Sequence, residues 1–347
     1  MKVDSNREDW RKSRLDSMKA DAYGAHTICR RAALPHVGGW GSYLSVFVLL
    51  MLGLLTTFSL PAQAAGGNFG PGSGDGSSSA QAKIIEDAAD LNAVRNGLNL
   101  YYKLAHDIDL SQYLCDPSDS SLPNCPAGGG PGYNGGAGWN PIGTYIPSAP
   151  PFTGNFDGAG HKITGLWIKR GSTVGVGLFG NITGATIANL GVETAATGVT
   201  GLGVVGGLVG LQTGGSITNS YARSNVSGVG SGNGNPDNCD SGGCAGGLVG
   251  AQAGGGSIKD SYATGNVSGP YDVGGLLGYR WGAGNIITNS YATGSVSGSS
   301  VGYAGGLLGY QTANGGSSSG ITDSYATGSV TSSGSYIGGL CIARRHR

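Results

Sequence analysis

The sequence is poor in charged, aromatic and histidine side chains. Of its 347 residues only 12% are charged and 8% are aromatic, and five are histidine. This composition is unlike that of an ordinary enzyme domain. The chain has 70 glycines instead, with Leu, Val, Ile and Ala spread thinly between them.

The pattern of the glycines excludes two further classes of protein. Glycine does not recur at every third residue, which argues against collagen, and regular apolar residues between the glycines argue against plain disorder. A repetitive β protein is the class that remains.

Residues 1–64 predict an export signal. An apolar run, Tyr43–Leu60, is followed by Ala62-Gln63-Ala64, the small residues that a signal peptidase needs, so we expect cleavage after Ala64. The run of 18 residues could also serve as an uncleaved anchor, which is the alternative. Met18 is a second candidate start. The basic residues before the run include Arg7, Arg11, Lys12, Arg14, Lys19, Arg30 and Arg31.

The charge of the exported part argues against nucleic acid as a partner. Loss of residues 1–64 removes eight basic and five acidic residues, out of 20 of each, and leaves a net charge of about −3. Such a chain has no electrostatic footprint for nucleic acid. We expect membrane contact only through the export signal.

Four of the six cysteines form two close pairs. Cys115/Cys125 and Cys239/Cys244 each lie in a loop rich in Pro, Asn, Asp and Gly, which in an exported protein predicts two local disulfides. A zinc site is the alternative, but the C-x9-C and C-x4-C spacings come without a nearby His. The remaining two are Cys29, in the leader, and Cys341.

The first part of the exported chain predicts coils with a loop insertion, over residues 81–192. A Gly/Ser leader at 65–80 is flexible by composition. A short helical pattern around Ala88–Arg95 precedes the strand-like segment Leu100–Leu110. Residues 111–151 form a loop rich in Pro and Gly.

A repeated phrase dominates residues 193–340. "GGLVG" or a variant begins at Gly206, Gly246, Gly274 and Gly305, and each copy is followed by a polar turn and then by "SYA". Unequal spacings with an intact phrase place the insertions in loops. Since so short a unit cannot bury its own apolar face, neighbouring units must stack. We predict an all-β fold: a right-handed parallel β-helix (β-solenoid) of the pectin-lyase-like type, with a short N-terminal helix and a signal segment.

Six aligned segments predict a bend between two strands; they begin at Ile163, Ile187, Ile217, Ile258, Ile287 and Ile321. Their third position holds only Gly, Asn or Asp, the residues that tolerate a left-handed backbone. The six residues are Gly165, Asn189, Asn219, Asp260, Asn289 and Asp323. A calcium-binding column is the alternative for the acidic members, but the repeats lack the G-G-x-G-x-D spacing that would support it.

A column of four tyrosines is the candidate contact surface. In the same alignment the positions on either side of the tyrosine are small or apolar, as in Leu190 and Val192, and therefore point inward. The position between them holds Tyr, Trp167 or Gly191, and by alternation it points outward. An inward tyrosine filling a wide coil is the alternative. The four residues are Tyr221, Tyr262, Tyr291 and Tyr325.

The phrases "GGLVG" and "SYATG" resemble the GLUG repeat. Four copies cover about Gly206–Gly334, a partial fifth begins at Gly338, and "GLFG" (Gly177–Gly180) is similar to a diverged earlier one. The phrases "YYKLAHDIDL", "WNPIG" and "FTGNFDGAGHKITGL" resemble the segment that precedes such repeats in bacterial surface proteins. In that family the repeats occur in secreted adhesins of the filamentous haemagglutinin type and in immunoglobulin A-specific metallopeptidases. The resemblance implies an exported β-helical scaffold.

The pattern breaks off at residues 341–347. After Leu340 it requires a small or apolar residue and then Gly, but the chain continues Cys341-Ile-Ala-Arg-Arg-His-Arg347. A solenoid that ends within a coil leaves strands uncapped. We therefore expect this sequence to be a piece of a longer protein.

The residues offer little for catalysis. A peptidase needs a motif such as H-E-x-x-H, and none of His106, His161 and His346 has a Glu beside it. A polysaccharide-cleaving enzyme needs two carboxylates flanking the bond, and the candidates are Asp107, Asp109 and Asp157. Turn and strand-surface roles account for these residues, and for His161, equally well.

We therefore expect an exported, non-catalytic surface adhesin or scaffold without cofactor or metal. Aromatic side chains on a polar β surface suit contacts with sugar or protein, so the expected partner is a glycan or protein on a host or neighbouring cell. We expect the chain to be secreted or held at the bacterial cell surface, associated with the outer membrane. The alternatives are a polysaccharide-degrading β-helix enzyme and the non-catalytic repeat region of a surface metallopeptidase.

Overall fold

A computed structural model describes most of the chain between residues 68 and 345. The described residues are 68–119, 121–122, 124–144, 150–230, 239, 243–299, 302–313, 320–333, 336–339 and 342–345, without the side chains of 313 and 342–345. The predicted export signal, Cys29, Cys341 and His346 lie outside these residues. The chain divides into two units, Met1–Leu60 and Pro61–Arg347, and the description concerns the second.

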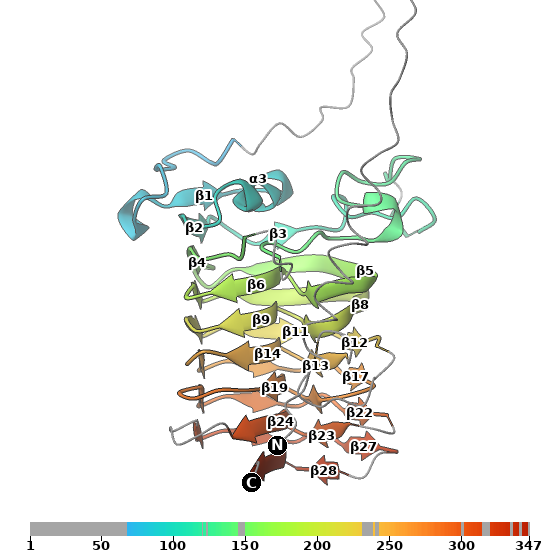
Figure 1. Cartoon of the computed structure of the whole chain (residues 1–347). Helices are drawn as coiled ribbons and strands as arrows, with labels where there is room; N and C mark the ends of the chain where they lie inside the picture. Colours follow the sequence, from blue (N-terminus) through green and yellow to red (C-terminus); the bar gives the residue numbers. More distant parts are fainter. Residues whose placement is uncertain are drawn as a thin grey trace, which may run out of the picture. The chain divides into compact units, whose positions relative to one another are not determined.

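Parallel strands from successive coils form three sheets (Figure 1). Sheet A consists of β1 (Lys83–Ile85), β2 (Tyr101–Leu104), β4 (Asn155–Asp157), β7 (Thr186–Ala188), β10 (Ser216–Thr218), β15 (Ser257–Lys259), β20 (Ile286–Thr288) and β25 (Gly320–Thr322). Sheet C consists of β6 (Phe179–Thr183), β9 (Val209–Thr213), β14 (Val249–Ala253), β19 (Leu277–Arg280), β24 (Leu308–Ala313) and β29 (Ile342–Arg345).

Within the described residues, sheet B has fifteen strands. They are β3 (Ile108–Asp109), β5 (Lys162–Val176), β8 (Gly191–Gly206), β11 (Tyr221–Arg223), β12 (Val226–Gly228), β13 (Cys244–Gly246), β16 (Tyr262–Ala263), β17 (Val267–Gly269), β18 (Val273–Gly274), β21 (Tyr291–Ala292), β22 (Val296–Gly298), β23 (Tyr303–Gly305), β26 (Tyr325–Ala326), β27 (Val330–Ser332) and β28 (Tyr336–Gly338). The fold prediction of an all-β parallel solenoid is confirmed.

The core is built from columns of one apolar residue per coil. Ile187, Ile217, Ile258 and Ile287 lie in register in sheet A and are fully buried. Each such side chain contributes about 1.5–3 kcal/mol by leaving water. Because every inward side chain packs against the coils before and after it, the coils stabilise one another.

The N-terminal elements cover the first coil. The predicted helix is α3 (Ala88–Ala93), continued by a 3-10 turn at Val94–Asn96. Asp87 Oδ1 accepts a hydrogen bond from Asp90 N at 2.8 Å and so caps the helix. Two further 3-10 turns lie at Ser79–Gln81 and Asn134–Gly136. The structure describes the predicted flexible leader from residue 68 onward. In this part Gly70 N donates a hydrogen bond to Ile84 O of β1 at 2.8 Å.

One step of the sequence alignment was wrong. Phe156, not Ile163, lies in register with Ile187, and Lys162, not Trp167, lies in register with Gly191. The bend between Phe156 and Lys162 holds two extra residues, Ala159 and Gly160. Matching by residue type therefore placed the coil seven positions too late before this bend and five positions too late after it. The bend at Gly165 belongs to the stretch of β5 that pairs with β3.

Candidate functional site

The four tyrosines stack face to face along sheet B. Tyr221, Tyr262, Tyr291 and Tyr325 are paired in register. Their ring centroids are 4.9, 4.8 and 5.1 Å apart, and successive planes differ by only 4–5°. We call this set the tyrosine column.

The tyrosine column lies on the outer face of the coil. The flanking residues Ser261 and Ala263 are 1% and 0% exposed, whereas Tyr325 is 53% exposed and the other three tyrosines are half-buried. The ring faces cover one another, so the column presents ring edges and hydroxyl groups to solvent. Alternation in the sequence indicated that the tyrosines point outward. The expected aromatic contact surface also assumed that the ring faces are free, and in the structure they are covered by neighbouring rings.

Charged residues surround the first member of the tyrosine column. Tyr221 Oη donates to Glu193 Oε1 at 3.1 Å, and Lys162 Nζ lies 3.2 Å from Glu193 Oε2. The Arg223 guanidinium lies over the Tyr221 ring, 5.3 Å from its centroid. Burial, with the hydrogen bond to Glu193, raises the pKa of Tyr221 to about 12. The Tyr221 hydroxyl therefore stays uncharged throughout the physiological pH range.

Columns of amides and hydroxyls run beside the tyrosine column. Asn225 Oδ1 accepts from Asn266 N at 3.1 Å, and Asn266 Oδ1 accepts from Ser295 N at 3.0 Å. The next column contains Ser227 and Ser268, whose hydroxyls are 3.4 Å apart. These side chains line a shallow depression of about 360 Å³. The outer face of sheet B is thus polar and repeats once per coil.

The bend before the tyrosine adopts the predicted left-handed backbone. All six aligned positions have φ between 48° and 70°. Asn219 Nδ2 donates to Asn189 Oδ1 at 2.9 Å, and Asn289 Nδ2 donates to Asp260 Oδ1. The side chains therefore bond from coil to coil. We call the five members from Asn189 to Asp323 the Asn/Asp column.

The glycines of the repeated phrase allow a corner in the coil. Leu248, in the middle of the phrase, is fully buried in the core. A Cβ on Gly246 would lie 2.0 Å from Val249 O, and a Cβ on Gly250 would lie 2.5 Å from Val205 N in the preceding coil. The backbones on the two sides of the corner are thus in contact, which no residue larger than glycine permits.

A second apolar cluster fills the outer side of this corner. It contains Val204, Leu211, Ala251, Tyr279, Tyr303 and Tyr310, together with Cys239 and Cys244. The Tyr303 and Tyr310 rings stack at 4.2 Å between centroids. We call this set the corner cluster.

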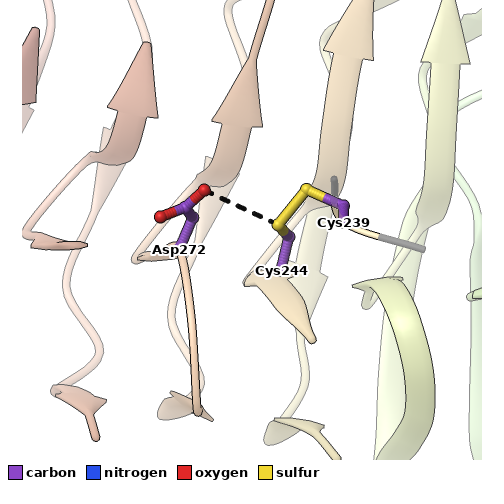
Figure 2. Close-up of side chains that lie close together, drawn as sticks. All are labelled: Cys239, Cys244 and Asp272. Atoms are coloured by element: carbon purple, nitrogen blue, oxygen red, sulfur yellow. Dashed lines mark hydrogen bonds between the residues drawn. A yellow bond between two sulfur atoms is a disulfide. The ribbon is translucent and has the colours of Figure 1, made fainter. Parts of the chain in front are cut away.

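Both predicted cysteine pairs are disulfides in the structure. Cys115–Cys125 and Cys239–Cys244 have Cα–Cα distances of 5.7 and 5.4 Å. Figure 2 shows Cys244 Sγ directed at the buried carboxylate of Asp272, 3.8 Å from Oδ2. Since a disulfide sulfur carries no proton, it donates no hydrogen bond to this oxygen.

These three side chains form the only metal-ligand cluster among the residues that the structure describes. A soft metal requires thiolates, and the disulfide occupies both sulfurs. In the disulfide form the cluster therefore offers a metal only the carboxylate of Asp272.

The sequence analysis missed a polar column inside the coil. Gln212 and Gln252 are fully buried, and Arg280 is 1% exposed. Gln252 Nε2 donates to Gln212 Oε1 at 3.1 Å, and Arg280 Nη2 donates to Gln311 Oε1. The signal was present, because Gln or Arg stands two residues after every copy of the phrase.

Each of the three candidate catalytic carboxylates accepts a hydrogen bond from the backbone. Asp109 Oδ1 accepts from Ser111 N at 2.9 Å, and Asp157 Oδ1 accepts from Ala159 N at 2.8 Å. Asp107 Oδ1 accepts from Lys162 N at 3.0 Å and lies 3.4 Å from His161 Nδ1. Asp109 and Asp157 thus have structural roles in their own turns, and Asp107 links two segments that lie 55 residues apart in the sequence.

Within the described ranges, no helix is long and apolar enough to cross a membrane. The apolar run Tyr43–Leu60 is not among these residues.

The fold and the repeated corner define a class of protein: a parallel β-solenoid built from Gly-Gly-Leu-x-Gly repeats. A family model described as "The GLUG motif" matches residues 201–227 and 241–268. The repeats in these two segments are therefore GLUG motifs, as their resemblance indicated.

Two named relatives share part of the chain. It is 33% identical over 143 residues to "Putative Gly-rich membrane protein" of Evansella cellulosilytica, covering 41% of this chain and 14% of that protein. It is 34% identical over 128 residues to "Halomucin" of Haloquadratum walsbyi, covering 35% of this chain and 1% of that protein. The chain thus spans a small part of the length of these relatives.

A solved crystal structure shows a similar fold. A crystal structure of "a putative immunoglobulin A1 protease" from Bacteroides ovatus matches with a TM-score of 0.52 and 21% identity, over 82% of this chain and 80% of that one. At this identity the likeness concerns the fold alone.

Proposed function

We propose that this chain is an exported, non-catalytic scaffold that acts as an adhesin at a bacterial surface. The observation that carries the proposal is the outer face of sheet B, where the tyrosine column and the amide and hydroxyl columns repeat in register from coil to coil. A partner whose own surface repeats can make the same contact several times, and many weak contacts then add to firm attachment.

The chemistry of this face favours hydroxyl-rich or polar partners. Because the tyrosine rings cover each other, the groups open to a partner are phenol hydroxyls, ring edges, serine hydroxyls and asparagine amides. These groups both donate and accept hydrogen bonds. A glycan or a polar protein surface on a host or neighbouring cell satisfies them, whereas a flat apolar partner would leave them buried and unpaired.

Export is supported by the disulfides and by the leader sequence. Structural disulfides persist in oxidising compartments, outside the cytosol. The basic and apolar segments of residues 1–64 have the order of a signal peptide. Two observations support a non-catalytic role. Asp109 and Asp157 accept hydrogen bonds within their own turns, and the two cysteines of the metal-ligand cluster are joined in a disulfide.

The test separates the hydroxyls from the rings. In a triple variant Tyr262→Phe, Tyr291→Phe and Tyr325→Phe the stacking persists and three hydroxyls are lost. We expect beads coated with this variant to bind roughly tenfold fewer cells than wild type, because several hydrogen bonds per contact disappear. Tyr101→Phe, on the outer side of sheet A, is the matched control and should bind normally.

Circular dichroism and thermal unfolding show whether the triple variant keeps its fold. Unchanged adhesion of a folded triple variant would refute the role of the tyrosine column. Retention of an epitope-tagged chain in the cytoplasm of the organism that naturally produces it would refute export.

A further inference from the structure

A groove of about 1110 Å³ lies on the outer face of sheet B, near its N-terminal end. One wall is the loop closed by the Cys115–Cys125 disulfide, and the other is formed by residues of β5 and β8. The tyrosine column does not line this groove. Its most distinctive lining side chains are Trp167, Tyr133, Asp116, Asp119 and Lys169.

Trp167 gives the groove a fixed aromatic surface. Its Nε1 donates to Leu114 O at 3.0 Å, which holds the indole in place. The Tyr133 ring is inclined to it by 59°, with centroids 6.1 Å apart. Unlike the tyrosine column, these two rings do not lie parallel over one another. An aromatic ring of this kind buries the apolar face of a ligand while polar groups around it stay hydrated.

Two carboxylates on one wall share the same local structure. Asp116 Oδ1 accepts from Ser118 N and Oγ at 2.8 and 2.7 Å, and Asp119 Oδ1 accepts from Ser121 N and Oγ at 2.9 and 2.6 Å. These bonds fix the orientation of the carboxylates, which accept further hydrogen bonds when ionised. Lys169, in β5 on the opposite wall, adds a donor. The groove therefore suits a ligand with many hydroxyls, and its pair of carboxylates disfavours an anionic one.

The groove continues along the solenoid. Thr197 and Thr200 line both this groove and the shallow depression beside the tyrosine column. From there the lining passes to Asn225 and Ser227, then to Asn266 and Ser268 in the next coil. The Oδ1 atoms of Asn225 and Asn266 bond to the backbone of the following coil, and their Nδ2 donors take no part in those bonds.

We propose that this groove binds a neutral, linear oligosaccharide. One sugar ring lies on Trp167, its hydroxyls donate to Asp116 and Asp119, and the following rings extend over Thr197 and Thr200 toward Asn225. An aromatic surface, an ionised acceptor pair and a linear array of amides and hydroxyls match the apolar ring faces and the many hydroxyls of such a chain. The proposal is separate from adhesion by the tyrosine column and stands without it.

The experiment uses the purified full chain and neutral cello-, xylo- and manno-oligosaccharides from disaccharide to hexasaccharide. Titration calorimetry and tryptophan fluorescence measure binding. We expect one series to bind, more tightly with each added sugar as contacts extend from the groove to the depression. Trp167→Phe should weaken binding roughly tenfold and abolish the fluorescence change.

Asp119→Asn tests the carboxylate wall without a risk to folding, since the side chain is exposed and Asn can still accept from Ser121. We expect it to weaken binding roughly tenfold. Asp75→Asn is the matched control, because exposed Asp75 accepts from Ser77 N in the same kind of turn and does not line the groove. The triple tyrosine variant should bind the sugar normally, which separates this site from adhesion.

Three results would overturn the proposal: no binding by any of the three series, binding that Trp167→Phe and Asp119→Asn leave unchanged, or binding of polygalacturonate alone. Preferential binding of an oligolysine peptide, lost in high salt, would also overturn it, because it would make the carboxylate pair a site for basic peptides.

Discussion

At the residue scale, the third position of each repeat sets the shape of the coil. Asn189, Asn219, Asp260, Asn289 and Asp323 have positive φ in the structure. Residues with a Cβ pay roughly 1–2 kcal/mol for this conformation, and Asn and Asp reduce the cost by bonding locally. The restriction to Gly, Asn and Asp was therefore visible in the sequence as a backbone requirement.

A pair of substitutions at Asn289 isolates that requirement. Both Asn289→Ala and Asn289→Gly remove the hydrogen bond to Asp260, but only alanine keeps the steric conflict of a Cβ at φ 48°. We expect the alanine variant to be less stable than the glycine variant by about 1 kcal/mol in chemical denaturation. Equal stability of the two variants would show that the bend tolerates a Cβ.

The outward direction of the tyrosine side chains was predicted from the residues themselves, and the geometry supports it. Whether their rings are open to a partner could not be predicted in this way. Alternation places Tyr262 between the buried Ser261 and Ala263. Whether a ring on the outer face lies open or stacked depends on its distance from the next ring, and that distance arises only when coils pair in register. The contact role of the tyrosine column stays a prediction.

At the scale of elements, the corner between sheets B and C explains the glycines of the repeat. A Cβ on Gly278 would lie 2.6 Å from Gly250 O and 2.7 Å from Ala245 O, both of which are backbone atoms that cannot yield. The strands on the two sides of the corner approach so closely that their outer residues form the corner cluster.

Gly278→Ala should therefore be severe. We expect a loss of about 3 kcal/mol or more in the free energy of unfolding, since the added methyl forces the strands apart. Gly320→Ala is the matched control in sheet A, because its Cβ would meet nothing within 4 Å, and its effect should stay within about 0.5 kcal/mol. Similar stabilities in thermal or urea unfolding would contradict this account of the corner.

The misplaced coil shows where element prediction fails. Ile163-Thr-Gly-Leu-Trp-Ile168 matches the later segments in residue type, yet it is Phe156 that lies over Ile187. A solenoid coil tolerates added residues at its bends. Spacing along the sequence therefore does not determine which residues of successive coils lie in register.

At the scale of the whole molecule, each coil depends on its neighbours. Ile258 and Val267 in the middle of the repeats are 0% and 1% exposed, whereas Ile321 and Val330, at the same positions of a later coil, are only partly buried. In such quasi-one-dimensional proteins stability is a sum of coil and interface terms. A coil with one complete interface is therefore less stable than one with two.

Hydrogen exchange can compare two nearly identical segments. Ser257–Gly269 ("SIKDSYATGNVSG") and Gly320–Ser332 ("GITDSYATGSVTS") have similar sequences and hence similar intrinsic exchange rates. We expect the strand amides of the second segment to exchange more than roughly tenfold faster in the 347-residue chain, because local opening there breaks fewer contacts. Equal protection would indicate that the solenoid opens as a single unit.

The sequence by itself determined the repeat, the parallel solenoid, the left-handed bends and the cysteine pairs, because each depends on local backbone preference or on a pattern that recurs along the chain. Tertiary structure alone decided the stacking of the tyrosine column, the true register of Phe156, the buried Gln and Arg column and the groove beside Trp167. These features depend on the distances between coils. Those distances are determined jointly by side chains and insertions that lie far apart in the sequence.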